Sequence, residues 1–246
     1  MRLITIPFSH YCEKARWALD AAGASYREEP HAPMAHMFAT RSVGAKTVPV
    51  LVYEGNVLGD STAIAHHADT LAPPERKLLP EDPDARARVL ALEDELDETM
   101  GVDARVIAYW HLLADGATGR GFVRRMLPPI PLAPYVVAPL FRGIIFRRYK
   151  VNQASARTAE ERVRATFARL ASTVEKDGYL VAGRFTLADL TLAALMSPVL
   201  APPEHPVLGR MKRTVPTAFE ALRAELSDTP VGRHALRVYR EHRRGD

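Results

Sequence analysis

The feature that most constrains the fold of this chain is the stretch APPERKLLPEDPD at residues 72–84. Upstream of it, β-rich runs alternate with runs of helix-forming residues, whereas nearly every segment downstream is typical of a helix. The stretch itself combines four prolines with charged residues, which is the composition of an interdomain linker. We therefore expect an α/β domain at residues 1–72, a linker at 73–83 and an all-α helical-bundle domain at 84–246.

The predicted order of elements in the first domain is β-α-β-(α)-β-β-α. Residues 2–6 (RLITI) are typical of a short strand, and a helix with Ser9 as its N-cap follows. Two further β-rich runs, separated by a turn, precede a last helix whose N-cap is Asp60 or Ser61.

The downstream segments show the apolar spacing and the capping residues of packed helices. One helix is expected to start after Pro83 with Asp84 as its cap. Another carries an apolar stripe at spacings of 4, 3 and 4, formed by Val163, Phe167, Leu170 and Val174. The segment FTLADLTLAALMSPV opens with Thr186 at the N-cap and Asp189 at N3, a capping-box pattern with aspartate in place of Glu or Gln.

Composition and charge narrow the class of protein. The chain has 246 residues, 47% of them hydrophobic, with a formal net charge of +4 and one cysteine. A single cysteine excludes an intramolecular disulfide framework and suits a reducing compartment, and no secretory signal is visible, so we expect a cytoplasmic location. The basic clusters at 146–150 and 232–246 lack a nucleic-acid-binding motif, so we expect solvated faces and no nucleic-acid partner.

Three stretches of the first domain carry groups that suit a ligand. Ser9 stands at a helix N-terminus, which favours negative charge, and its hydroxyl can donate to a thiolate that a ligand supplies. The Val48-Pro49 bond can adopt the cis form and turn the backbone of Val48 toward an extended peptide. Asp60 and Ser61 can meet the ammonium and the carboxylate of an α-amino acid. Read singly, each stretch also fits a structural role.

The one cysteine, Cys12, leaves two interpretations open. An exposed thiolate at the helix start could exchange with mixed disulfides of a small thiol, without a second protein cysteine. A free cysteine is more often buried as a small apolar residue.

The acidic residues between 93 and 98 are expected to be solvated, and the histidines lack metal-ligand spacing with the cysteine, so we expect no metal. No nucleotide-binding glycine motif is present, so we expect no nucleotide cofactor.

Together these stretches resemble the cytosolic glutathione transferase superfamily, which joins a thioredoxin-like domain to an all-helical domain. SHYCEKARWALD is similar to a thioredoxin CxxC helix start with Ser9 replacing the first cysteine, and TVPVL is similar to the cis-proline strand. GDSTAIAHHAD resembles the ESxAI glutathione-binding turn, with Asp60 replacing glutamate. The Thr186/Asp189 box resembles the S/T-x-x-D box of the helical domain.

The resemblance implies glutathione as a substrate and assigns roles in binding it. Ser9 would hydrogen-bond the glutathione thiolate, with Cys12 and then Tyr11 as the alternatives for this role. Separate residues would hold the γ-glutamyl, cysteinyl and glycyl parts of the ligand. The implied glutathione-binding residues are Lys46, Val48, Pro49, Asp60 and Ser61, with Arg41 and His36 behind Lys46.

A Pro-rich insertion at about 119–150 is expected to depart from the pattern of the glutathione transferase superfamily. Its core MLPPIPLAPYVVAPLF, at 126–141, has 16 residues without a charge and five prolines, which is too short and too Pro-rich to span a membrane. One interpretation is a loop and short helix that roof a second-substrate pocket together with Tyr109, Trp110 and His111. Others are contact with an anionic membrane surface or a partner protein through 126–150, or a packed connection between helices.

Three functional hypotheses follow. The leading one is a homodimeric transferase in which Ser9 activates glutathione for attack on an apolar electrophile. The second is a glutathione-dependent thiol oxidoreductase that uses Cys12. The third is a non-catalytic binding or scaffold protein that uses the inserted segment as its contact surface.

Overall fold

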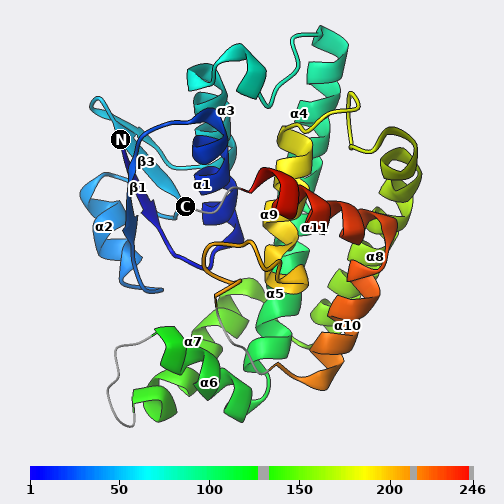
Figure 1. Ribbon diagram of the computed structural model, residues 1–246. Coiled ribbons are helices and arrows are strands. Elements are labelled where there is room, and N and C mark those ends of the chain that lie inside the picture. The colour runs from blue at the N-terminus through cyan, green and yellow to red at the C-terminus, as the bar shows by residue number, and fades with distance from the viewer. Residues whose placement is uncertain (127–132, 211–214, 244–246) are drawn as a thin grey trace.

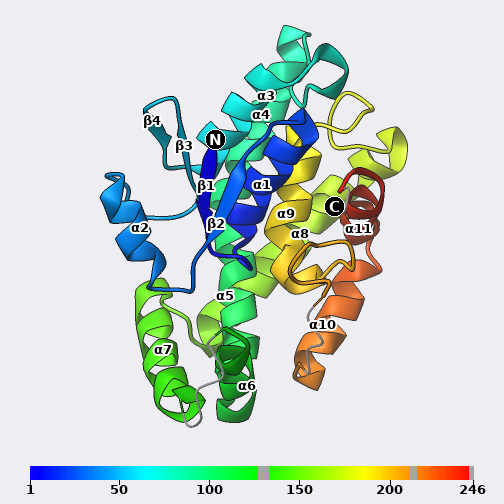
Figure 2. The ribbon, with the colours of Figure 1, turned by 60° about the vertical axis from the view of Figure 1, so that its left-hand side comes forward.

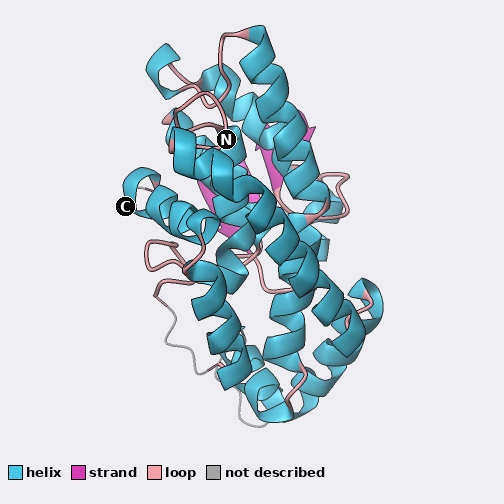
Figure 3. Cartoon of the chain, turned by 90° about the vertical axis from the view of Figure 1, so that its right-hand side faces the viewer, coloured by secondary structure: helices cyan, strands magenta, loops and turns pink. Residues whose placement is uncertain are grey.

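The computed structural model describes residues 1–126, 133–210 and 215–243. Its N-terminal part is a small sheet with helices on both sides, and its C-terminal part is a group of helices packed beside it (Figure 1). Strands occupy one region of an otherwise helical molecule (Figure 3). The predicted α/β domain followed by an all-α domain is confirmed.

Among the described residues, four strands form one sheet: β1 (Arg2–Thr5), β2 (Arg27–Pro30), β3 (Val50–Tyr53) and β4 (Asn56–Leu58). Their order is β2-β1-β3-β4, with β1 parallel to β2 and antiparallel to β3, and β3 antiparallel to β4. The helices α1 (His10–Ala22) and α3 (Ser61–Leu71) pack together on one face, and α2 (His36–Ser42) lies on the other side of the sheet (Figure 2).

The strand directions decide which parts of the chain meet at one end of the sheet. β1 and β4 are both antiparallel to β3, so they run in the same direction and end where β3 begins. In this register Ile4 pairs with Val50, and Leu51 pairs with Leu58. The helices that follow β1 and β4 therefore both start at the end of the sheet where the residues preceding β3 lie.

The helical domain is built around one buried helix. Its described helices are α4 (Pro83–Glu98), α5 (Met100–Leu113), α6 (Gly116–Met126), α7 (Ala133–Tyr149), α8 (Gln153–Asp177), α9 (Leu187–Leu200), α10 (Thr217–Ser227) and α11 (Pro230–His242). All residues of α9 except Pro198 are buried, and this helix contacts α1, α4, α5, α10 and α11. The predicted apolar stripe of α8 is also buried. The two domains therefore share one core, in which α1 packs directly on α9.

The predicted capping box of α9 is confirmed. The Asp189 carboxylate accepts hydrogen bonds from Thr186 N at 2.9 Å and Thr186 Oγ1 at 2.9 Å. It also accepts from Leu180 N at 2.9 Å, and it lies 2.8 Å from Nε2 of His234 on α11. One buried carboxylate thus joins the start of α9, the preceding loop and α11.

The connection at 73–83 is packed rather than extended into solvent. It includes a short 3₁₀ helix, Pro74–Arg76, and two buried leucines. The Asp69 carboxylate on α3 accepts from the backbone N–H groups of Leu78 at 2.6 Å and Leu79 at 3.1 Å. The expected cap of α4 was misplaced by two residues: Asp82 accepts from Ala85 N at 2.8 Å, and Pro83 occupies the first turn.

The described part of the segment at 119–150 forms two helices, whereas one interpretation of the sequence was a loop and a short helix. α6 and α7 pack on each other and on α5, although α7 contains Pro139. The outer surface of α7 exposes Tyr135, Val136 and Leu140. The link between the two helices, at 127–132, lies outside the described residues. None of the described helices is both long and apolar enough to cross a membrane. Contact of 126–150 with a membrane or a protein stays a prediction.

A buried charge cluster joins the two domains and corrects the expectation that the acidic residues of α4 are solvated. Lys14 of α1 and Glu93 of α4 are both 0% exposed and form an ion pair. Lys14 also pairs with Asp97 and donates to Thr62 Oγ1 of α3 at 2.8 Å. Only one face of α4 is exposed to solvent. Asp94 lies on that face, whereas Glu93 faces α1.

A second buried charge cluster corrects the expectation that the basic residues at 232–246 are all solvated. Arg243 is buried and pairs with Glu13 at 2.7 Å and with Asp20 at 2.8 Å, both on α1. Glu13 in turn pairs with Arg16. Exposed residues such as Arg240 agree with the solvated face that was predicted, but Arg243 fixes the end of the chain to the first domain.

Candidate functional site

Ser9 caps α1 at the end of the sheet where β1 finishes. Its backbone is extended, with φ −76° and ψ 124°, and its Oγ accepts a hydrogen bond from Cys12 N at 3.5 Å. The residue is half-buried. Because the cap uses a lone pair of Oγ, the hydroxyl proton is still able to point at a ligand.

The residues before β3 lie beside this helix start. The Val48-Pro49 peptide bond is cis, as the resemblance implied. Pairing of β3 with β1 begins at Val50, so the backbone groups of half-buried Val48 stand beyond the described ladder. They are positioned at the same end of the sheet as Ser9.

Asp60 caps α3 at this end too. Its Oδ1 accepts from Thr62 N at 2.8 Å and Ala63 N at 3.1 Å, and its side chain is exposed. Ser61 is 2% exposed, so Asp60 is the accessible member of this pair. Asp60, and not Ser61, is therefore the N-cap.

The electrostatics of this end favour an anionic ligand. α1 and α3 both start here, so the partial positive charges of two helix N-termini face the same region. The hydrogen bond from Lys14 Nζ to Thr62 Oγ1 joins α1 to the first turn of α3. Lys46 and Arg41 are exposed, and His36 is half-buried. The ion pairs of the described residues include neither Lys46 nor Arg41, which leaves both cations available to a carboxylate.

Cys12 lies behind Ser9 in the protein interior. It is 0% exposed, and its Sγ accepts from Ile6 N at 3.4 Å. Burial raises the pKa of the Cys12 thiol to about 11, so the thiol stays protonated near neutral pH. The surroundings of Cys12 match a small core residue better than an exchanging thiolate.

Tyr11 joins α1 to the last turn of α4, and His10 joins α1 to α5. Tyr11 Oη donates to Asp97 O at 3.1 Å, and burial raises the Tyr11 pKa to about 12. Burial lowers the pKa of His10 to about 3, so its neutral ring donates from Nε2 to Gly101 O at 2.9 Å. A Cβ on Gly101 would come within 2.4 Å of Tyr11 Oη, so glycine allows this close contact. Tyr11 therefore has a structural partner already.

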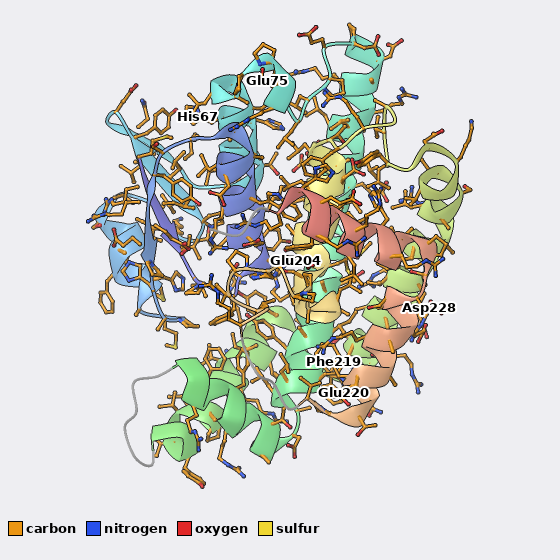
Figure 4. All side chains as sticks on the ribbon, viewed as in Figure 1. His67, Glu75, Glu204, Phe219, Glu220 and Asp228 are labelled. Carbon is orange, nitrogen blue, oxygen red and sulfur yellow. The ribbon has the colours of Figure 1, made fainter. Side chains whose placement is uncertain are left out.

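The residues predicted for a second-substrate pocket do not face one region. Tyr109 and Trp110 lie toward α7, with ring centroids 5.6 Å from Tyr149 and 6.2 Å from Phe146. His111 turns away from α7: it stacks on Phe219 of α10, which is labelled in Figure 4, and lies 3.1 Å from Glu160 of α8. Consecutive helix positions differ by about 100° in direction, which separates His111 from the other two.

Sequence reasoning missed three side chains near the start of α1. Phe8, just before Ser9, packs edge-to-face on Phe122 of α6 at 5.7 Å, so α6 reaches the candidate site. Arg105 lies over the ring of Tyr11 at 5.7 Å. Its position four residues before Tyr109, and so on the same helix face, was the signal that could have identified it.

Two cavities lie away from this end of the sheet. They have volumes of about 480 and 690 Å³, and both are lined by Asp20 and Arg243 along the C-terminal half of α1, away from Ser9 and Asp60. Within the described ranges, no three His, Cys, Asp or Glu side chains are grouped so as to hold a metal ion.

Two family models match the chain. They are the glutathione S-transferase N-terminal domain, over residues 3–76, and the glutathione S-transferase C-terminal domain, over residues 130–227. The chain therefore belongs to the glutathione S-transferase superfamily, and its α/β domain is the thioredoxin-like domain of that fold. No curated protein matches the sequence.

Solved structures share the fold over nearly the whole chain. β-Etherase LigF from Sphingobium sp. strain SYK-6 has 19% identity and a TM-score of 0.61, with 96% of this chain and 98% of that chain covered. The theta class glutathione S-transferase from the citrus canker pathogen Xanthomonas axonopodis pv. citri, with glutathione bound, has 19% identity and a TM-score of 0.55, with 96% of each chain covered. A glutathione S-transferase from Methylobacillus flagellatus KT, with GSH bound, has 17% identity and a TM-score of 0.53, with 95% and 98% covered.

Proposed function

We propose that this protein is a glutathione transferase that activates the glutathione thiol for attack on an apolar electrophile. The observation that carries the proposal is the meeting of Ser9, Val48 and Asp60 at one end of the sheet, where two helices begin. Glutathione offers a thiol, an extended peptide backbone and an α-amino acid end, which are the three groups that these residues suit. Two of the solved structures with this fold have glutathione bound.

Each part of glutathione has a complementary group in the proposed complex. The Asp60 carboxylate would hold the γ-glutamyl ammonium, while the backbone N–H of Ser61, the first residue of α3, would hold its carboxylate. The backbone of Val48 pairs with the cysteinyl unit. Lys46 binds the glycyl carboxylate, with Arg41 and His36 behind it.

Ser9 acts in this proposal by stabilising the thiolate. Its hydroxyl donates a hydrogen bond to sulfur, and the dipole of α1 favours the negative charge, so the pKa of the bound thiol falls and its proton leaves to water. The thiolate then forms a carbon–sulfur bond with the electrophile, and the leaving group departs with the electron pair of the bond that breaks. No covalent bond to the protein is needed.

The alternative enzyme, a thiol oxidoreductase that uses Cys12, is less well supported. Exchange requires an accessible thiolate, and Cys12 is buried with a raised pKa. The scaffold alternative rests on the exposed face of α7 and does not explain the groups at the sheet end. We extend the transferase proposal to a homodimer in the cytoplasm, where a free cysteine remains reduced.

Replacement of Ser9 by alanine tests the role of its hydroxyl. Ser9→Ala should lower kcat by about 10²-fold, the usual effect of removing one hydrogen bond to a developing or bound anion. The KM for glutathione should change only a few-fold, because other groups hold the tripeptide. Steady-state kinetics with 1-chloro-2,4-dinitrobenzene measure both constants.

Two matched variants complete this experiment. Ser9→Thr keeps a hydroxyl at the cap and should retain most of the turnover lost in Ser9→Ala. Cys12→Ser should retain conjugation. Turnover equal to wild type in Ser9→Ala would remove Ser9 from the mechanism.

A further inference from the structure

A cation without an acidic partner stands beside the start of α1. Arg105 projects from α5, and its guanidinium lies 4.4 Å from the ring centroid of Tyr149 and 5.7 Å from that of Tyr11. Its Nε is buried and has no hydrogen-bond partner. In the part of the chain that the structure describes, Arg105 is in no ion pair.

The buried cations of α1 are neutralised, whereas Arg223, half-buried on α10, also has no ion pair within the described residues and donates to Val199 O at 2.8 Å. Lys14 pairs with Glu93, and Arg16 pairs with Glu28 at 2.7 Å. The acidic residue nearest to Arg105 along α5 is Asp103, and it is held by Arg162 of α8. Asp103 therefore forms no ion pair with Arg105, although the two residues are only two positions apart in the sequence.

The surroundings of Arg105 leave part of its charge uncompensated. Removing a cation from water costs free energy unless charge or hydrogen bonds replace the lost hydration. Contact with an aromatic face returns roughly 0.5–2 kcal/mol. The rings of Tyr11 and Tyr149 hold the guanidinium in place but offer no anion. An anionic ligand group would complete this site and would gain bidentate hydrogen bonds from the planar guanidinium.

The position of Arg105 relates this cation to the second substrate. Tyr11 lies two residues after Ser9 in the first turn of α1, so Arg105, over the Tyr11 ring, stands at the same end of α1 as the proposed thiolate. Tyr109 lies one turn after Arg105 and faces Tyr149. Aromatic surface and a cation are thus adjacent, on the side of the thiolate that faces α5 and α7.

We infer that the second substrate is an aromatic electrophile with a carboxylate or similar anionic group, and that Arg105 binds this group. The inference rests on the proposed transferase function and refines its substrate class. The carboxylates of glutathione are assigned to the starts of α3 and β3, so they do not occupy Arg105. Arg105 acts as a specificity residue, and the carbon–sulfur bond forms at Ser9 without its participation.

A binding experiment with two conjugates tests the inference without requiring turnover. S-(4-carboxybenzyl)glutathione and S-benzylglutathione differ by a single carboxylate. Calorimetric titration of the wild type should show at least tenfold tighter binding of the carboxylated conjugate. Arg105→Gln should bring the affinity ratio close to one, and Arg105→Lys should keep an intermediate ratio. Arg142→Gln, at an exposed arginine stacked on Phe146, should leave the ratio unchanged.

The possible failures are distinguishable. If the wild type binds S-benzylglutathione but does not prefer the carboxylated conjugate, or if Arg105→Gln keeps the preference, Arg105 does not bind the substrate anion while the proposed function stands. If the wild type binds neither conjugate, the glutathione site itself is refuted, and this inference falls with it.

Discussion

Lys14→Met should lower the free energy of unfolding by about 3–5 kcal/mol, the usual loss when one partner of a buried ion pair is removed. Glu93 would remain in the core without its cation, and its second oxygen, Oε2, already lacks a hydrogen-bond partner among the described residues. The same substitution would also remove the contacts of Lys14 with Thr62 and Asp97. α1 and α3 would then lose the hydrogen bond that joins them directly, and the contact of Thr62 Oγ1 with Glu93 Oε1 at 2.7 Å would remain as a link from α3 to α4.

Urea unfolding followed by circular dichroism measures this loss. Lys46→Met, at an exposed lysine, is the matched control and should change stability by no more than about 0.5 kcal/mol. The double variant Lys14→Met/Glu93→Met should recover part of the loss, because it removes the unpaired buried charge. Equal stability of Lys14→Met and Lys46→Met would show that the cluster does not hold the domains together.

Asp189→Ala should lower the free energy of unfolding by about 3–4 kcal/mol. The buried carboxylate accepts hydrogen bonds from Thr186 N and Leu180 N and faces His234. A lost helix cap costs about 0.5–2 kcal/mol, and each buried donor left unpaired costs about 1–3 kcal/mol, with incomplete additivity. α9 lies in the shared core, so the loss affects both domains.

Asp228→Ala is the control for this prediction, because its side chain is exposed near the start of α11 (Figure 4). Thermal and urea unfolding should show a change of no more than about 0.5 kcal/mol for that variant. Asp189→Asn keeps an acceptor oxygen and should lose less than Asp189→Ala. A loss below about 1 kcal/mol for Asp189→Ala would mean that the box contributes no more than an exposed cap.

Helix starts were predictable from the sequence, because capping residues within one turn specify them. Ser9, Asp60 and the pair Thr186/Asp189 stand where helices begin, and a cap is specified by residues within one helical turn. The order of strands and helices in the first domain follows from short-range pattern in the same way. Asp82 in place of Asp84 is an error of two positions, because two aspartates flank Pro83 and both are good caps.

Interactions between distant segments were not predictable in this way. Glu93 is 79 positions from Lys14, and Arg243 is 230 positions from Glu13, so nothing local distinguishes them from solvated charges. Their burial depends on how α4 and the end of the chain dock on α1. The α6–α7 pair was missed for a related reason: Pro139 argues locally against a helix that packing on α6 supports.

The sequence predicted which residues belong to the candidate site better than it predicted which of them lie close together. The resemblance named Ser9, Pro49 and Asp60, and the strand directions place them at one end of the sheet. The grouping of Tyr109, Trp110 and His111 failed because adjacency in sequence differs from adjacency on a helix face. Arg105 has no motif, and its isolation from acidic groups is visible only in three dimensions.

Glutathione binding is the central claim, and calorimetric titration of glutathione into wild type and Asp60→Asn tests it most directly. Asparagine can still cap α3, so this variant removes the charge that meets the γ-glutamyl ammonium while keeping the helix start. Asp60→Ala removes the cap as well, and Asp94→Asn is the control at an exposed carboxylate. We expect saturable binding to wild type and Asp94→Asn, with affinity at least tenfold lower in both Asp60 variants. Absence of binding to the wild type, or equal affinity in Asp60→Asn, would contradict the assignment of this end of the sheet to glutathione.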